Sequence, residues 1–286
     1  MIATLSENSA AERCEALLHH LPPFPSVAMR LMRELSDDDA EVGDIVSLLR
    51  SDPAITAKLL AHANSALQGG SAPVKTLQQS LVKLGFQQTR RIVMRAATAS
   101  YSGRAFRTIE LQHCWRHSLA CAELSSELAG KVGLDSDLAY TAGLMHDIGR
   151  LGLLVAHTDA YITMVHELEQ SGPLRDSLFL LDRENQRFGV DHCEAGCWLM
   201  EHWNAPLELG AVAGRHHDKP DANIIGLVEL VHSGCRLASA LGFSTIDASA
   251  GTWQEVTSGI PDVFANSVTE DEDDLRGRIA AVIDAV

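Results

Sequence analysis

Apolar residues recur every three or four positions along most of the chain, which is the periodicity of amphipathic helices. A typical helix start is Asp52-Pro53, because a capping aspartate followed by proline favours the first turn of a helix. The segment AITAKLLAHANSAL then keeps helical spacing until Gly69 and Gly70. Nowhere do apolar and polar residues alternate through a run rich in β-branched residues. The pattern therefore predicts an all-α fold without a β-sheet.

Proline, glycine and capping residues indicate where further helices start and stop. The proline-rich segment 21–25 predicts an extended strap, and Ser36 before three aspartates predicts the start of a helix. Gly85 separates two helices, LQQSLVKLG and FQQTRRIVM. Long helices are expected at about 111–131 and from about residue 136 onward.

The C-terminal region has a different pattern. Residues 244–267 are polar and predict a loop, after which Thr269 should cap a final acidic helix. The chain is thus expected to have four parts. They are a lead at residues 1–14, an N-terminal helical part at 15–110, a helical core at 111–243, and a C-terminal loop with an acidic helix at 244–286.

The composition is typical of a globular protein that needs neither a membrane nor disulfides. Of the 286 residues 46% are hydrophobic, yet no run approaches about 18 apolar residues, so no membrane span is expected. The first residues lack the basic start and the apolar run of a secretory signal. The six cysteines show no framework spacing, which favours reduced thiols and a cytoplasmic location.

Charge is distributed unevenly. The net charge is −15, but residues 53–109, the basic segment, hold eight basic and no acidic residues. This segment is either a docking face for an acidic partner or a face that packs against the acidic remainder of the fold. Two helices meet at Gly85, with Arg90, Arg91 and Arg95 on the second, which is also the layout of a DNA-reading motif. Because the chain is strongly acidic, no DNA partner is expected.

The candidate chemistry lies in histidines and carboxylates. His146 and Asp147 occur within the apolar sequence AGLMHDIG, where burying an adjacent ionisable pair costs several kcal/mol without compensation. Imidazole and carboxylate are ligands for zinc, iron or manganese, and an aspartate can bridge two metals. Adjacent helix positions point about 100° apart, which suits neighbouring coordination sites. Further candidates are His117, His192, His216, His217 and Cys235.

Other histidines and cysteines have ordinary interpretations. Cys193 and Cys197 are one helical turn apart, which is typical of two small core residues on one face. The alternative is a metal or redox sensor, which would use Cys235 together with Cys193 or Cys197. A lone histidine on a helix is more often hydrogen-bonded or solvated than a ligand. This interpretation is applied to His19, His20, His62, His113, His157, His166, His202 and His232.

Two stretches carry a family resemblance. AGLMHDIGRLGLL, with His117 upstream, resembles the HD superfamily of metal-dependent phosphohydrolases. Earlier in the chain, LPPFPSVAMRLMRELSDDDAEVGDIVSLLRSDPAITAKLLAHANSAL followed by VKTLQQSLVKLGFQQTRRIVM closely resembles the HDOD family, an HD-related group of bacterial signalling and regulatory domains. The resemblance covers about residues 15–243. It implies an HD-domain-like helical bundle with an N-terminal helical subdomain.

The resemblance to active HD and HD-GYP enzymes implies a ligand set. The implied metal ligands are His117, the signature pair His146 and Asp147 with Asp147 bridging, and His192, His216 and His217 completing a second site. The last expected ligand is an aspartate in V-H-x-A-D-x-L-A, but this chain reads VHSGCRLA, so Cys235 stands in its place. Arg150 replaces the lysine often seen after the HD-x-G turn. The GYP signature of cyclic-di-GMP phosphodiesterases is absent, because DKPDA follows His217.

Cysteine at position 235 changes the expected metal chemistry. A thiolate is a good ligand for zinc or ferrous iron and a poor one for magnesium or manganese. The thiol must first lose a proton with a pKa of about 8.5, so metal binding becomes more pH-dependent. The expected cofactors are one or two divalent transition metals (Fe, Zn or Mn), or none.

The resemblance implies a regulatory module without efficient catalysis, because HDOD members commonly lack a full catalytic set. Such a module would bind separate signalling proteins, with the basic segment as a docking surface, and a nucleotide is a further candidate ligand. The alternative is an active metal-dependent phosphohydrolase acting on a nucleotide or cyclic dinucleotide. Its catalytic residues would be Asp147, which bridges the metals, and Arg150, which helps to hold phosphate.

Overall fold

The computed structural model describes residues 9–18, 25–34, 41–65, 74–102, 108–170, 177–221, 224–245 and 251–284. Within these ranges the regular structure is helical and no strand is present, which confirms the all-α prediction. Two compact units are distinguished. They are Pro22–Gly103, the small unit, and Met1–Leu21 with Arg104–Val286, the large unit. The four parts expected from the sequence remain a prediction about which segments fold together.

The small unit contains α2 (Ser26–Glu34), α3 (Val42–Arg50), α4 (Pro53–Ser65) and α5 (Leu77–Ser102). Asp52 caps α4 as predicted, because its side chain accepts a hydrogen bond from the backbone N–H of Ile55 at 3.1 Å. Gly85 has a φ of 76° and divides α5 into two helical segments at the predicted position. Ser36, Gly69, Gly70 and most of the predicted strap at 21–25 lie outside the described residues.

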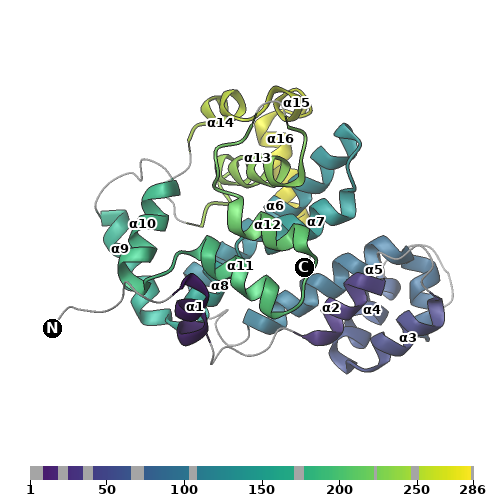
Figure 1. The fold of residues 1–286 in the computed structure, drawn as a ribbon. Coiled ribbons are helices and arrows are strands. Elements are labelled where there is room, and N and C mark those ends of the chain that lie inside the picture. The colour runs from purple at the N-terminus through teal and green to yellow at the C-terminus, as the bar shows by residue number, and fades with distance from the viewer. Residues whose placement is uncertain are drawn as a thin grey trace. The chain divides into compact units, whose positions relative to one another are not determined.

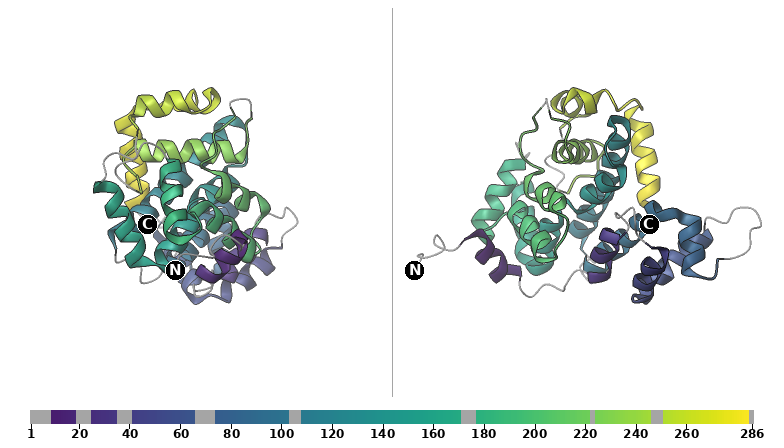
Figure 2. Two further views of the ribbon diagram at one scale, coloured as in Figure 1. Left: turned by 60° about the vertical axis from the view of Figure 1, so that its left-hand side comes forward. Right: turned by 45° about the vertical axis from the view of Figure 1, so that its right-hand side comes forward.

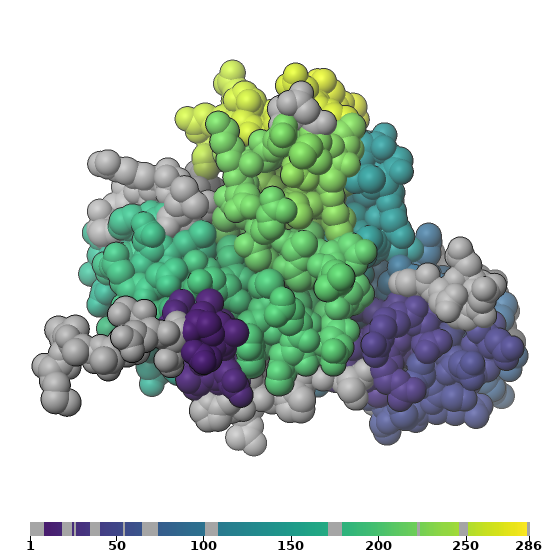
Figure 3. Space-filling view, viewed as in Figure 1, coloured from purple at the N-terminus to yellow at the C-terminus, as the bar shows by residue number. Residues whose placement is uncertain are grey.

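The large unit contains α1 (Ala10–Leu18), α6 (Ile109–Val132), α7 (Ser136–Met145), α8 (Ile148–Ala156), α9 (Thr158–Gln170), α10 (Ser177–Phe188), α11 (His192–His202), α12 (Leu207–Arg215), α13 (Leu227–Ala240), α14 (Trp253–Gly259), α15 (Asp262–Ala265) and α16 (Glu272–Asp284). Helix α6 packs against α7 and α13, and α11 packs against α8 and α12 (Figure 1). Helix α14 lies beside α13, and α16 lies beside α6 (Figure 2). Helix α1 contacts α8 and α11, and its purple surface adjoins the green surface in Figure 3.

Helix α6 shows why the longer helices could be predicted. The side chain of Thr108 accepts a hydrogen bond from the backbone N–H of Leu111, and Gly133 ends the helix with a φ of 78°. The observed ends therefore lie within about two residues of the expected 111–131. None of the described helices is long and apolar enough to cross a membrane.

Two predictions for the C-terminal region are wrong. The stretch at 244–267 contains α14 and α15, because a Thr252–Glu255 capping box starts α14 and buried side chains anchor both helices. Each helix is so short that its apolar residues do not repeat often enough to reveal a period. Helix α16 starts at Glu272, after Asp271 rather than Thr269, because the Asp271 side chain accepts a hydrogen bond from the backbone N–H of Asp273 at 3.0 Å.

A glycine allows α8 and α11 to meet backbone to backbone. A Cβ atom on Gly149 would lie 2.0 Å from the carbonyl oxygen of His192 and 2.4 Å from the backbone N of Gly196. No side chain larger than hydrogen fits at this position. The contact holds the start of α8 against the start of α11, and so places Asp147 near His192.

Candidate metal centre

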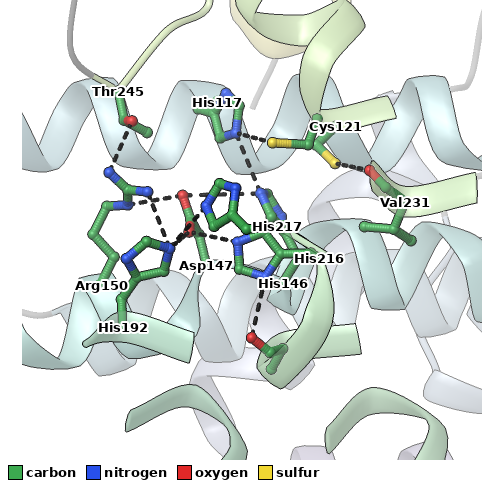
Figure 4. A network of polar contacts seen from close by, with 12 residues as sticks. His117, Cys121, His146, Asp147, Arg150, His192, His216, His217, Val231 and Thr245 are labelled. Atoms are coloured by element: carbon green, nitrogen blue, oxygen red, sulfur yellow. Dashed lines mark hydrogen bonds and ion pairs between the residues drawn. The ribbon is translucent and has the colours of Figure 1, made fainter. Parts of the chain in front are cut away.

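All seven residues predicted as metal ligands come together among the helices of the large unit (Figure 4). They form two groups, and in each group the ligand atoms lie within 4.8 Å of one another. The first group, the thiol half, consists of His117, His146 and Cys235. The second group, the aspartate half, consists of Asp147, His192, His216 and His217. The sequence therefore identified side chains that the fold brings into one cluster.

Helix ends position most of these residues. His146 and Asp147 occupy the break between α7 and α8, where Asp147 leaves helical geometry with φ −97° and ψ 19°. Asp191 caps α11 through a capping box, so His192 is fixed in the first turn of that helix. The turn after α12 carries His216, whose carbonyl oxygen accepts a hydrogen bond from Nδ1 of His232 at 2.8 Å. Rigid helix termini thus hold the ligand atoms in place.

In the thiol half, nitrogen lone pairs face one another. Nδ1 of His117 donates to the carbonyl oxygen of Phe243, and Nδ1 of His146 donates to that of Gly143, both at 2.7 Å. Because a carbonyl oxygen can only accept, each neutral ring presents a lone pair on Nε2. These two Nε2 atoms lie 3.2 Å apart, and Sγ of Cys235 lies 3.4 Å from Nε2 of His117.

Near neutral pH, neither of these two histidine rings gains a second proton that could form a hydrogen bond between the facing Nε2 atoms. The rings of His117 and His146 are buried, and this burial lowers the pKa of both residues, that of His146 well below its usual range. Two acceptors therefore meet without a proton between them. A metal cation would satisfy both lone pairs together with the sulfur, so the donor set fits a divalent transition metal.

The aspartate half contains a second pair of acceptors. Oδ1 of Asp147 lies 3.4 Å from Nε2 of His192 and 3.4 Å from Nε2 of His216. Nδ1 of His216 donates to the carbonyl oxygen of Ala213, so its Nε2 also offers a lone pair. Among the described residues, neither Asp147 Oδ1 nor His216 Nε2 has a hydrogen-bond partner. This half also fits a cation, with His217 Nε2 placed 3.0 Å from His192 Nε2.

Arg150 places a permanent positive charge beside these ligands. Its Nε lies 3.0 Å from Asp147 Oδ2, and its Nη2 lies 3.3 Å from His192 Nε2. Its Nη1 donates to the hydroxyl of Thr245 at 3.1 Å. Burial alone would raise the pKa of Asp147, but the Arg150 guanidinium and the surrounding rings outweigh burial and hold that pKa well below its usual range. Asp147 and Arg150 thus form a buried ion pair.

Sequence reasoning missed two residues that support the centre. Glu184 on α10 is fully buried, and its Oε2 accepts hydrogen bonds from Nδ1 of His192 at 2.6 Å and from the backbone N–H of the same residue at 2.9 Å. The hydroxyl of Tyr161 donates to the other oxygen of Glu184. Glu184 lies in the polar run RENQR, which is typical of a solvated face. The available signal was its spacing of four residues from the apolar Leu180, which is buried in the structure.

Access to the centre is restricted. Six of the seven ligand candidates are no more than 8% exposed, and only His217 is half-buried. His217 lines a pocket of about 540 Å³ that is formed by residues of α1, α10, α11 and α12 with the residues that flank them. Cys193 and Cys197, interpreted from the sequence as small core residues, line this pocket. The charged residues of its wall are Asp191, Glu194, Glu201, Asp218 and Arg215.

Two curated proteins are similar to part of this chain in sequence. An uncharacterized protein of Treponema pallidum is 25% identical over 207 residues, which are 71% of this chain and 38% of that protein. Ribonuclease Y of Lactobacillus gasseri is 29% identical over 136 residues, which are 47% of this chain and 19% of the enzyme. The chain thus spans well under half the length of these curated relatives.

Solved structures show the same fold. An HDOD domain protein of unknown function from Geobacter sulfurreducens has a TM-score of 0.69 at 21% identity, over 96% of this chain and 93% of that one. A candidate phosphohydrolase from Shewanella amazonensis has a TM-score of 0.67 at 21% identity, over 94% of this chain and 93% of that one. The family model of the HDOD domain matches residues 21–219, which is most of the chain. With this match and the shared helical fold, the chain belongs to the HDOD family.

Proposed function

We propose that this chain is an HDOD-type regulatory module that binds a divalent transition metal at its buried centre and does not turn over phosphoesters efficiently. One observation carries the proposal: seven metal-ligating side chains gather in two adjoining groups, with the ligand atoms of each group within 4.8 Å of one another, inside a shell that excludes solvent from nearly all of them. The geometry supports metal binding, and the enclosure supports a structural or regulatory role for it.

Some residues of the centre would bind the metal directly, and others orient the ligand side chains. His117, His146 and Cys235 would be ligands in one half, and Asp147 with His192, His216 and His217 in the other. When bound, a divalent metal supplies Lewis-acid polarisation of a phosphoryl oxygen. Glu184 orients the ring of His192 through its Nδ1, and backbone carbonyl groups do the same for the rings of His117, His146 and His216.

Two features disfavour efficient catalysis on an anionic substrate. The pocket that reaches His217 carries four carboxylates against a single arginine, which repels phosphate. The guanidinium of Arg150 already contacts Asp147, His192 and Thr245, so holding a phosphate would require it to leave these partners. These features favour the regulatory interpretation over turnover.

Regulation would act through a separate signalling protein that docks on the basic segment. Lys58 and Lys75 are exposed and suit such a surface, whereas Arg90 is buried at 9% exposure. Charge reversal at Arg90 would therefore test folding rather than docking. The docking test is the double variant Lys58→Glu, Lys75→Glu, which should lose the partner while keeping the unfolding temperature of the unmodified chain.

The metal proposal is tested by the metal content of untagged protein purified without chelators, measured by mass spectrometry. The control is the double variant His146→Ala, Asp147→Ala. We expect about one metal per chain in the unmodified protein and a loss in the control. The absence of metal after reconstitution with iron, manganese and zinc would overturn the proposal.

A second candidate function is a metal-dependent phosphohydrolase that acts on a nucleotide or cyclic dinucleotide. It is favoured by the presence of six of the expected His and Asp ligands, all except the aspartate that Cys235 replaces, and by the partial similarity to ribonuclease Y. Metal-loaded protein should then hydrolyse cyclic dinucleotides, and Asp147→Asn should abolish that activity. Turnover at the background rate in the metal-loaded protein would instead support the regulatory module.

A further inference from the structure

The two halves of the centre differ in what already surrounds their lone pairs. In the thiol half, three neutral side chains converge, and Nε2 of His117 and His146 face each other in Figure 4. The donor set of two nitrogens and one sulfur is one that soft metals prefer. Among the described residues, no lysine or arginine lies within hydrogen-bond or ion-pair distance of these three ligand atoms.

Two ligand-to-ligand distances in the thiol half are close to those of a tetrahedral metal site. Zinc–nitrogen bonds of about 2.0–2.1 Å and zinc–sulfur bonds of about 2.3 Å give edges of about 3.3 Å between two nitrogens and about 3.6 Å between nitrogen and sulfur. The corresponding separations here are 3.2 Å for His117 to His146 and 3.4 Å for Cys235 to His117. Both separations lie within about 0.2 Å of the tetrahedral edges, and the third, between Sγ of Cys235 and Nε2 of His146, is no more than 4.8 Å.

The aspartate half already contains a cation. Figure 4 shows the guanidinium of Arg150 next to both Asp147 and His192, and it lies 3.0 Å from a carboxylate oxygen of the first and 3.3 Å from Nε2 of the second. Those two residues are ligand candidates of this half. A divalent ion placed among them would have a fixed positive charge as an immediate neighbour, in a buried site where screening by solvent is weak.

From these differences we infer that the centre takes its first metal, a soft divalent ion such as zinc or ferrous iron, in the thiol half through Cys235, and that Arg150 makes a second metal in the aspartate half bind far more weakly. The inference rests on the proposed function, since it presumes that the centre binds metal. It adds the metal class, the order of loading and a role for Arg150 as an internal cation. The thiol proton leaves to solvent when the sulfur binds.

Cobalt(II) is a suitable probe because thiolate coordination gives a near-ultraviolet charge-transfer band that nitrogen and oxygen ligands do not give. Full-length protein freed of metal would be titrated with cobalt(II) and followed by absorbance. We expect the sulfur band to grow and saturate with the first equivalent. A second equivalent should bind at least about tenfold more weakly, and without further sulfur absorbance.

Matched variants test the role of the Cys235 sulfur and the role of the Arg150 charge one at a time. Cys235→Ser should remove the band, whereas Cys121→Ser should keep it, because Cys121 does not belong to the ligand group. Cys121 is a matched control, since it is also buried and lies one turn from His117 on the same helix. Arg150→Met removes the charge and keeps an unbranched side chain as far as the position of Nε, and it should strengthen binding of the second equivalent at least about tenfold. Arg150→Lys keeps the charge and should leave the second equivalent weak. Circular dichroism confirms that each variant is folded.

The outcomes distinguish this inference from the proposed function. Failure of the unmodified protein to bind cobalt, zinc or iron would overturn both. Tight binding without a sulfur band, or with a band that appears only at the second equivalent, would leave the proposed function standing and overturn the inference. Two equivalents of equal affinity in the unmodified protein would also overturn it.

Discussion

Among single residues, Glu184 decides the charge of His192. Burial alone would lower the pKa of His192, but the Glu184 carboxylate outweighs burial and raises that pKa from 6.5 to about 10. In the metal-free protein at pH 7, His192 is therefore an imidazolium ion paired with a buried carboxylate. A metal that binds Nε2 of His192 must displace this proton.

The amide variant Glu184→Gln should bring the pKa of His192 below 6.5. Burial and the neighbouring Arg150 guanidinium both favour the neutral ring, and the compensating carboxylate charge is gone. The pKa is measured by NMR titration of the His192 ring in metal-free protein. Asp182→Asn, an exposed change on the same helix, is the matched control and should leave the pKa near its original value. An unshifted pKa in Glu184→Gln would contradict the assigned role.

The same residue marks the limit of prediction from sequence. His146 and Asp147 could be predicted because ionisable residues inside an apolar helix are costly unless they have a function. Glu184 could not, since its neighbours along the chain are polar and its partner is eight residues away at the start of another helix. Contacts of this kind depend on how helices pack, which local patterns do not specify.

At the scale of elements, the backbone contact between α8 and α11 holds Asp147 and His192 of the metal centre close together. Gly149→Ala would put a methyl group 2.0 Å from a carbonyl oxygen that cannot retreat without moving α11. We expect a loss of about 1–3 kcal/mol in the free energy of unfolding, the usual range for overpacking. Urea denaturation measures this loss.

Gly277→Ala is the control for that substitution. Gly277 is an exposed residue of α16, and no atom lies within 4 Å of the position of an added Cβ. Alanine should therefore be neutral or stabilise by up to about 1 kcal/mol through its helix propensity. Equal stability of the two alanine variants would show that α8 and α11 do not need their close approach.

Element length explains which helices could be predicted. Helix α6 spans many turns between a threonine cap and a left-handed glycine, so both its period and its ends are visible in the sequence. Helices α14 and α15 have seven and four residues, too few for a period, and their buried Val256 and Phe264 resemble isolated apolar residues in a loop.

For the whole molecule, the buried histidines make stability depend on pH. His117, His146 and His217 have pKa values lowered by burial, whereas in the unfolded chain a histidine pKa is about 6.5. The unfolded chain therefore binds more protons in acid, and the free energy of unfolding falls as the pH drops through 6.5. His192 acts oppositely, because its stabilisation is complete below 6.5 and is lost as the pH rises toward about 10.

The unfolding temperature of the metal-free protein should accordingly be highest near pH 7. It should fall toward pH 5, where the histidines with lowered pKa values contribute. It should also fall toward pH 10, where the stabilisation by His192 is lost and where thiols whose pKa burial raises ionise in the unfolded chain before they ionise in the folded one. Thermal denaturation in EDTA at constant ionic strength, followed by circular dichroism, tests this profile. A protein that becomes more stable between pH 7 and pH 5 would be inconsistent with neutral buried rings.

The convergence of distant segments on the thiol half has a consequence for the unfolded chain. His117 and Cys235 are 118 positions apart, yet their ligand atoms lie 3.4 Å from each other. A metal held by both would act as a reversible cross-link that closes a long loop. In the loop-entropy model, a covalent link of this length removes about 4–5 kcal/mol of unfolded-state freedom. The bound metal would then take the part that disulfides take in secreted proteins, tying the chain through a bond that opens when the metal leaves.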